Sequence, residues 1–261
     1  MATDVNISYK VRNLCFSYGK TEVIGDLSFD LHDDLITTVI GANGCGKSTL
    51  FNLMTKNLTP AGGEIFFREK PLSDIRLKDF AKQAAIVHQY NTAPSDLTVE
   101  KLVSYGRTPY HAFGLSPDAA EDEEKIKWAM EITGTLKYKD IPVSELSGGQ
   151  KQRVWIAMAL AQGTKVLFLD EPTTYLDIRY QLQILKLIKK LNREFGITII
   201  MVLHDINQSL YYSDEIVAMK DGKILAQGSP ESIIGTDLVE EVFGVRLNIA
   251  KADGKPFIIP V

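Results

Sequence analysis

The sequence predicts an α/β fold, in which buried strands alternate with helices. The short, mostly apolar runs 35–40, 166–169 and 197–203 are typical of buried strands. The segment 178–195, in contrast, repeats apolar residues at helical spacing and predicts one long amphipathic helix. This alternation of strand and helix patterns favours a sheet covered by helices.

A glycine-rich segment follows the first of these strands and precedes a short helical run, 50–54. It matches the pattern G-x-x-x-x-G-K-[ST] without a mismatch, through Gly41, Ala42, Asn43, Gly44, Cys45, Gly46, Lys47, Ser48 and Thr49. In this pattern, backbone N–H groups and the helix N-terminus attract phosphate, and the lysine reaches the outer phosphates. Ser48 would supply a hydroxyl to a magnesium ion. The sequence therefore predicts a P-loop NTPase core that binds ATP or GTP.

Composition and charge are ordinary for a globular protein. The chain has 261 residues, 45% hydrophobic and 24% charged, with a formal net charge of -4. Because it has no long basic block, we expect no nucleic-acid partner. The spacing of Cys15 and Cys45 predicts neither a disulfide nor a metal site. Residues 1–5 lack a secretory pattern and no apolar run is long enough to cross a membrane, so we expect membrane association only through a partner.

Residues 7–31 alternate apolar and polar side chains and turn at 18–20, which predicts two antiparallel strands. Tyr18, on that turn, could stack on a nucleotide base, although exposed tyrosines are common on turns. The run 84–89 is apolar until its last two residues, His88 and Gln89. This is the pattern of a buried strand that delivers polar side chains to a site.

The character of the sequence changes over residues 91–147, where several prolines occur. Apolar residues in this segment recur at helical spacing, which predicts a mostly helical insert. The acidic cluster 121–124 comes soon after Ser116-Pro117, where negative charge suits the start of a helix. A helix start is therefore favoured over a metal site for this cluster.

The segment Leu146-Ser147-Gly148-Gly149-Gln150 leads into a helical run. A glycine pair at a helix start is a second potential anion site. Taken alone, the same pattern also fits a simple helix entry after a loop.

Two further strand ends carry polar residues. Asp170 and Glu171 end the apolar run that begins at Val166, and ligands bind at this edge of an open α/β sheet. Asp170 could hold magnesium, and Glu171 could act as general base toward water, unless the two acids are a plain surface pair. His204 follows the run 197–203, where a structural role is the alternative to a catalytic one.

A hairpin is expected over 216–226, with its turn at Asp221-Gly222.

These motifs together resemble an ABC transporter ATPase subunit, in their order and spacing, from about residue 7 to residue 228. The resemblance implies that Tyr18 stacks on adenine and that Gln89 joins the magnesium site to a transmembrane partner. It also implies that His204 contacts the γ-phosphate and the attacking water, with Lys47, Gln89, Glu171 and His204 as catalytic residues. Ser48, Gln89 and Asp170 would hold Mg²⁺.

The resemblance also implies a homodimer. Ser147, Gly148, Gly149 and Gln150 would bind an ATP that is held by a second copy, with Asp177 at the dimer seam. ATP would hold the two copies together and its hydrolysis would let them open. This explains why one chain has two helix starts suited to anions.

Two stretches, 97–111 and 172–178, are similar to those in ATPases of bacterial iron-siderophore importers, although Tyr175 departs from the small residue of many other ABC ATPases. They imply import of a ferric siderophore through a separate membrane permease, with an extracytoplasmic binding protein delivering it. The chain would then lie at the cytoplasmic face of the membrane. ATPases of haem and cobalamin importers are similar too, and an exporter subunit or a soluble ABC mechanical switch are further alternatives.

We expect a single ABC nucleotide-binding domain over residues 1–261. Its core would be an α/β unit with a mixed sheet and an N-terminal antiparallel β subdomain, formed by 1–90 and 148–228. The helical insert would span 91–147 and carry the signature at its end, and 229–261 would form short helices and an irregular tail.

Overall fold

The structure, a computed structural model, describes residues 6–111, 118–252 and 254–259 and divides into two compact units. Unit 1 holds the described residues up to Ile75 and from Thr198 onward, and unit 2 runs from Arg76 to Ile197. Two predictions concern residues that the structure does not describe. One is the lack of a secretory signal in residues 1–5, and the other is the approach to the acidic helix at residues 116–117. The domain boundaries at 90/91 and 147/148 stay a prediction.

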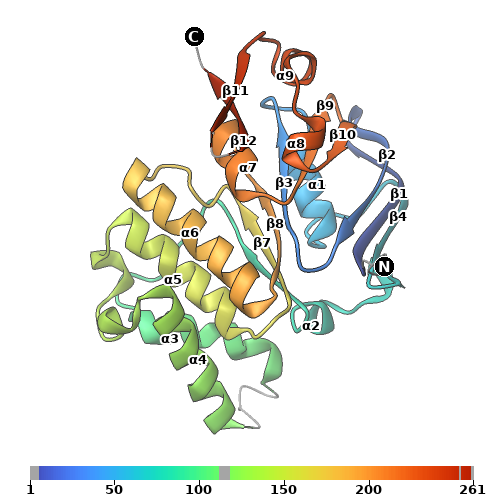
Figure 1. The fold of residues 1–261 in the computed structure, drawn as a ribbon. Helices are drawn as coiled ribbons and strands as arrows, with labels where there is room; N and C mark the ends of the chain where they lie inside the picture. The colour runs from blue at the N-terminus through green and yellow to red at the C-terminus, as the bar shows by residue number, and fades with distance from the viewer. Residues whose placement is uncertain (1–5, 112–117, 253, 260–261) are drawn as a thin grey trace. The chain divides into compact units, whose positions relative to one another are not determined.

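Unit 1 contains an antiparallel sheet with the strand order β2-β1-β4-β5. Figure 1 labels β2, β1 and β4 of this sheet. Its strands are β1 (Ile7–Tyr18), β2 (Thr21–His32), β4 (Gly62–Phe67) and β5 (Lys70–Pro71). Tyr9 and Val11 of β1 are fully buried, as the alternating pattern requires. Leu14 is fully buried as well, because the register of β1 shifts between Val11 and Leu14. The predicted antiparallel subdomain is confirmed.

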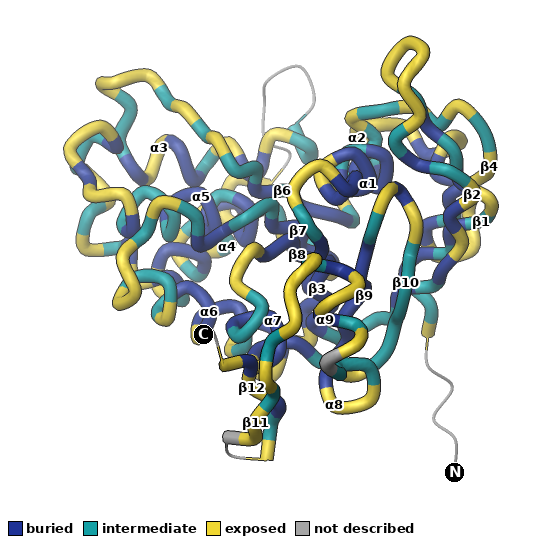
Figure 2. The backbone as a smooth tube through the Cα atoms, turned by 90° about the horizontal axis from the view of Figure 1, so that it is seen from above, coloured by how far each residue is buried: buried dark blue, intermediate teal, exposed yellow. Residues whose placement is uncertain are grey.

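A mixed arrangement of strands also belongs to unit 1, in which β8 and β9 both pair parallel with β3 and β10 pairs antiparallel with β9. These strands are β3 (Ile36–Gly41), β8 (Thr198–Val202), β9 (Glu215–Lys220) and β10 (Lys223–Gly228). Every residue of β3 and β8 is buried, which explains their apolar runs (Figure 2). Asp221 and Gly222 both have positive φ, 47° and 74°, so the predicted hairpin turn is confirmed.

The helical segments of unit 1 are α1 (Lys47–Met54), η1 (Leu72–Asp74), α7 (Ile206–Tyr212), α8 (Pro230–Ile233) and α9 (Thr236–Phe243). The expected irregular tail is wrong, because β11 (Asn248–Ala252) pairs antiparallel with β12 (Lys255–Ile259). The side chain of Asn207 in α7 holds this hairpin: its Nδ2 donates to Ile258 O at 2.9 Å and its Oδ1 accepts from Ile258 N at 2.8 Å. The amide therefore pairs with β12 as a neighbouring strand would.

Unit 2 contains two parallel strands, β6 (Ala84–Val87) and β7 (Val166–Asp170). Its helical segments are α2 (Leu77–Phe80), α3 (Val99–Ser104), η2 (Tyr105–Tyr110), α4 (Ala119–Thr133), η3 (Leu136–Tyr138), η4 (Val143–Glu145), α5 (Gly148–Ala161) and α6 (Ile178–Phe195). The long helix predicted over 178–195 is confirmed. So is the acidic helix start, because the Asp118 carboxylate accepts from Glu121 N at 2.9 Å.

The segment 105–110 is built into the helical part of unit 2. A Cβ atom at Gly106 would lie 2.1 Å from Met158 O, so α5 approaches this position too closely for any side chain. Arg107 is only 2% exposed, and its Nε donates to Asp122 Oδ1 at 2.6 Å while its Nη1 donates to Ala161 O at 3.2 Å. The buried ion pair ties η2 to α4, and the hydrogen bond to Ala161 O ties η2 to α5.

Within the described residues, no helix is both long and apolar enough to cross a membrane.

Candidate nucleotide site

The phosphate loop of unit 1 connects β3 to α1. Gly46 is the N-cap of α1 and has a φ of 106°, a conformation that a side chain would disfavour. Lys47 is 6% exposed, and its Nζ donates to Gly41 O and Ala42 O, each at 2.9 Å. Among the residues that the structure describes, no carboxylate forms an ion pair with Lys47, so its buried positive charge is suited to an anion.

The β9–β10 hairpin packs against the phosphate loop. Gly222 N donates to Cys45 O at 3.0 Å. A Cβ atom at Gly41 would lie 2.4 Å from Met219 O. The sequence predicts the hairpin, but nothing local in it indicates that its turn contacts the phosphate loop.

The outer side of the loop has room for phosphate. Gly44 and Ser48 are exposed, and a Cβ atom at Gly44 would meet no atom within 4 Å. Asn43 is exposed as well, whereas Thr49 is buried. Burial raises the pKa of the Cys45 thiol, although the Lys47 charge opposes it, so no thiolate competes with phosphate for the lysine.

Two other predicted residues belong to unit 1. Tyr18 ends β1, is 52% exposed and packs edge-on against Phe16, with ring centroids 4.9 Å apart. His204 is exposed two residues after the end of β8 at Val202, and the next residue, Asp205, caps α7. Their roles toward a nucleotide stay predictions.

In unit 2, Gln89 and Glu171 meet at the ends of the parallel strands β6 and β7. Gln89 Nε2 donates to Glu171 Oε2, and Thr174 Oγ1 donates to the same oxygen at 3.0 Å. Glu171 has a φ of 50°, an uncommon backbone conformation for a residue with a side chain. Such strain occurs where a side chain is held for a task, which fits a base placed just after Asp170 at the end of β7. Thr174 is a contact that the sequence motifs did not indicate.

The signature segment forms the N-terminus of α5. Ser147 N donates to Gln150 Oε1 at 2.8 Å, and Gln150 Nε2 donates to Tyr138 Oη at 2.9 Å. Gly149 is buried, whereas Gly148 is exposed. Gln150 therefore stabilises the helix start, and Gly148 presents backbone at the surface.

Asp177 caps α6, because its Oδ1 accepts from Tyr180 N at 3.1 Å. This contact accounts for an aspartate here within one chain. A role at a dimer seam stays a prediction.

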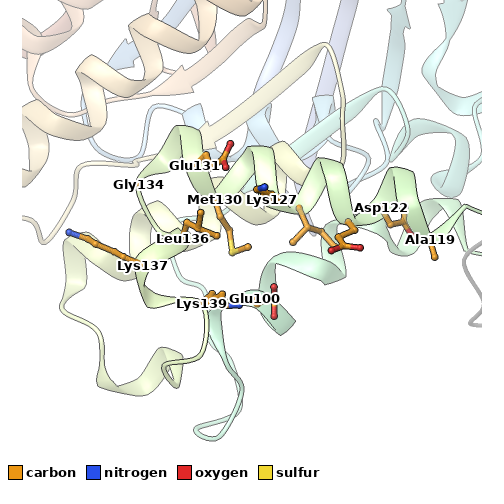
Figure 3. Close-up of a pocket in the computed structure, with 12 residues that line it drawn as sticks. Glu100, Ala119, Asp122, Lys127, Met130, Glu131, Gly134, Leu136, Lys137 and Lys139 are labelled. Carbon is orange, nitrogen blue, oxygen red and sulfur yellow. The ribbon is translucent and has the colours of Figure 1, made fainter.

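A cavity of about 1010 Å³ lies in the helical part of unit 2 (Figure 3). It is lined by residues of α3, α4 and η3, among them Glu100, Met130 and Leu136. The described residues that line it include none of those predicted for the nucleotide site.

The part of the chain that the structure describes has no cluster of three or more His, Cys, Asp or Glu side chains that could hold a metal ion. Mg²⁺ usually binds through one or two protein ligands together with substrate phosphates. Ser48 of unit 1 offers one hydroxyl for that mode of binding, and Asp170 of unit 2 offers one carboxylate. A shared role of the two residues at one Mg²⁺ stays a prediction.

A glycine-rich loop between a buried parallel strand and a helix, with a buried lysine at its end, defines a P-loop nucleotide-binding protein. The model of the ABC transporter family matches residues 24–174. The chain belongs to that family, so the family and the α/β fold predicted from the sequence are confirmed.

Relatives and solved structures extend this result to nearly the whole chain. The iron(3+)-hydroxamate import ATP-binding protein FhuC of Bacillus subtilis is 44% identical over 243 residues, which cover 93% of this chain and 90% of FhuC. A structure of a transporter described as of metal-chelate type, in an inward-facing conformation, has a TM-score of 0.85 at 25% identity and matches 98% of each chain. A dimeric post-hydrolysis state of the cassette MJ0796, bound to ADP and Pi, has a TM-score of 0.73 at 25% identity and matches 85% of this chain and 98% of MJ0796.

Proposed function

We propose that this chain is the ATP-hydrolysing subunit of an importer for an iron chelate, and that two copies dimerise around two ATP molecules. One observation carries the proposal: the chain has two separate features suited to phosphate, the loop around Lys47 and the exposed Gly148 at the start of α5. The likeness to the import protein FhuC supports the cargo class.

The residues of the phosphate loop would bind the ATP phosphates through their backbone N–H groups. Lys47 would exchange its two carbonyl acceptors for phosphate oxygens and offset the charge that develops on them. Tyr18 would stack on the adenine ring, which its exposure allows.

Hydrolysis would be an in-line attack of water on the γ-phosphorus, with cleavage of its bond to the β,γ-bridging oxygen. Glu171 would accept the proton of the attacking water, and His204 would contact the water and the γ-phosphate. The products are ADP and inorganic phosphate. Ser48, Gln89 and Asp170 would hold Mg²⁺, which supplies positive charge to the phosphate oxygens when it is bound.

The signature residues 147–150 would bind the ATP held by the second copy, with Asp177 at the seam. Gly148 suits this role because its backbone is exposed and the chain itself leaves room beside it. The dimeric state of the similar cassette MJ0796 supports this arrangement. ATP would favour the closed dimer because it would contact both copies only there.

Transport requires partners that the chain does not supply itself. We infer a separate integral-membrane permease, to which this subunit binds at the cytoplasmic face, and an extracytoplasmic protein that delivers the chelate. The chain would not touch the cargo, so the chelate would be selected by those partners.

Uptake of labelled ferric siderophores, haem and cobalamin by cells without this chain tests the cargo assignment. We expect loss of ferric siderophore uptake, its recovery with the wild-type chain, and no recovery with Glu171→Gln. Loss of cobalamin or haem uptake alone would contradict the iron-chelate assignment.

A further inference from the structure

Two exposed tyrosines of unit 2 join the loop after β6 to the loop after β7. Tyr90 directly follows Gln89, and Tyr175 lies on the same loop as Glu171. Their hydroxyl oxygens are 2.7 Å apart, which is a hydrogen bond, and their ring centroids are 6.1 Å apart. The two loops are therefore connected twice, once through Gln89 and Glu171 and once through the tyrosine pair.

Burial does not explain these two rings. Tyr90 is 69% exposed and Tyr175 is 79% exposed, so neither contributes much apolar area to a core. Tyr175 also has a φ of 63°, a backbone conformation that is unfavourable for an aromatic residue. An exposed aromatic side chain on a strained backbone indicates that Tyr175 is held there for its contact with Tyr90.

We propose that Tyr90 and Tyr175 are positioning residues, whose hydroxyl contact holds the loop of Gln89 against the loop of the catalytic base Glu171. The role of Glu171 rests on the proposed function, but the contact does not. Gln89 Nε2 donates to Glu171 Oε2, so the amide nitrogen of Gln89 faces Glu171 and its amide oxygen points away from it. The tyrosine pair keeps Gln89 in this orientation, which a residue that offers its oxygen to a metal requires.

Conservative variants test the proposal. Tyr90→Phe and Tyr175→Phe each remove one hydroxyl and keep the ring. We expect each to lower kcat about two- to tenfold, the range for loss of one neutral hydrogen bond, with unchanged affinity for ATP. The double variant should be no slower than the slower single variant, because both changes break one contact. Tyr105→Phe is the matched control, since Tyr105 is 47% exposed and its hydroxyl has no hydrogen-bond partner among the described residues.

Amide hydrogen exchange of the nucleotide-free protein gives a second readout that does not depend on hydrolysis. Both single variants should exchange faster than wild type in the loops 88–91 and 171–177, and Tyr105→Phe should not. Unchanged exchange in these loops would overturn the contact. Faster exchange with wild-type kcat, or additive losses of kcat in the double variant, would overturn the positioning role.

Tyr175→Asn separates positioning from folding. Asparagine tolerates positive φ better than tyrosine, so the melting temperature should not fall, whereas kcat should fall as in Tyr175→Phe. A lower melting temperature with wild-type kcat would overturn the proposal. If wild-type protein did not hydrolyse ATP, the proposed function would fail, and the exchange experiment would still decide whether the contact exists.

Discussion

Tyr180 packs directly on Gly149: a Cβ atom added at Gly149 would lie 2.3 Å from Tyr180 Cδ1. At the neighbouring Gly148, an added Cβ atom would meet only Leu176 Cδ2, at 3.6 Å, which is an ordinary contact. The two glycines of the signature therefore differ in what they do. The chain needs Gly149 for its own packing, whereas Gly148 leaves room that the chain itself does not fill.

This difference predicts opposite outcomes for two alanine variants. Gly149→Ala should lower the melting temperature, because α6 or α5 must shift to admit the methyl group. Gly148→Ala should leave the melting temperature near that of wild type and lower ATP-dependent dimerisation and ATPase activity, because the methyl group would meet the nucleotide. Thermal unfolding and ATPase rates measure both effects. A Gly148→Ala protein with wild-type ATPase activity would contradict a nucleotide at this helix start.

Lys47→Ala should weaken ATP binding about 10- to 150-fold, the range for loss of a hydrogen-bonded charge. Lys186→Ala, which removes an exposed lysine of α6, is the matched control and should bind ATP as wild type does. Titration with a fluorescent ATP analogue measures both affinities. An affinity of Lys47→Ala for the ATP analogue equal to that of wild type would count against the phosphate-binding role of Lys47.

Asn207→Ala should loosen the C-terminal hairpin. The change leaves the backbone N–H and C=O of Ile258, a residue that is 1% exposed, without the amide that pairs with them. We expect a loss of about 1–3 kcal/mol in the free energy of unfolding or of local opening. Hydrogen exchange in β12 and denaturant unfolding report it. Asn248→Ala, at an exposed position of β11, is the control, and equal effects of the two variants would rule out the pairing role of Asn207.

Arg107→Met should be among the most destabilising changes in unit 2. It leaves Asp122, whose side chain is 12% exposed, without the guanidinium that lies 2.6 Å from its carboxylate. Breaking one side of a buried ion pair costs about 3–5 kcal/mol when the remaining charge has no other partner. Because His111 Nε2 lies 2.8 Å from the other oxygen of Asp122, the loss should be nearer the lower figure. Arg76→Met, which breaks an exposed ion pair with Asp79, should cost much less than Arg107→Met. Similar unfolding midpoints for the two variants would contradict the structural role of Arg107.

Local sequence patterns predicted the regular elements of the fold well. The helix over 178–195, the turn at 18–20 and the turn at Asp221-Gly222 depend on residue periodicity and on turn chemistry, both of which lie within a short window. The C-terminal hairpin was missed although Asp253-Gly254 is a strong turn signal, because its strands are short and Asn207, which holds it, is far away in the sequence. Residue 253 itself lies outside the described residues.

The contacts that hold the candidate site could not be predicted in the same way. Gly222 supports Cys45, and Tyr90 contacts Tyr175, only because distant segments meet in the folded chain. Motifs indicated Gln89 and Glu171, but not that Thr174 shares the Glu171 oxygen. Sequence spacing thus identified the chemistry of the site, and its supporting contacts required the structure.

The proposed cycle depends on an ATP-bound dimer, and Glu171→Gln tests it most directly. This change keeps the shape of the side chain and removes the base, so hydrolysis should slow about 10²- to 10⁴-fold while ATP binding persists. Sedimentation of the purified variant with and without MgATP then measures assembly. The account predicts a dimer with MgATP and a monomer without it. A variant that stays monomeric at saturating MgATP, or that hydrolyses ATP at the wild-type rate, would contradict it.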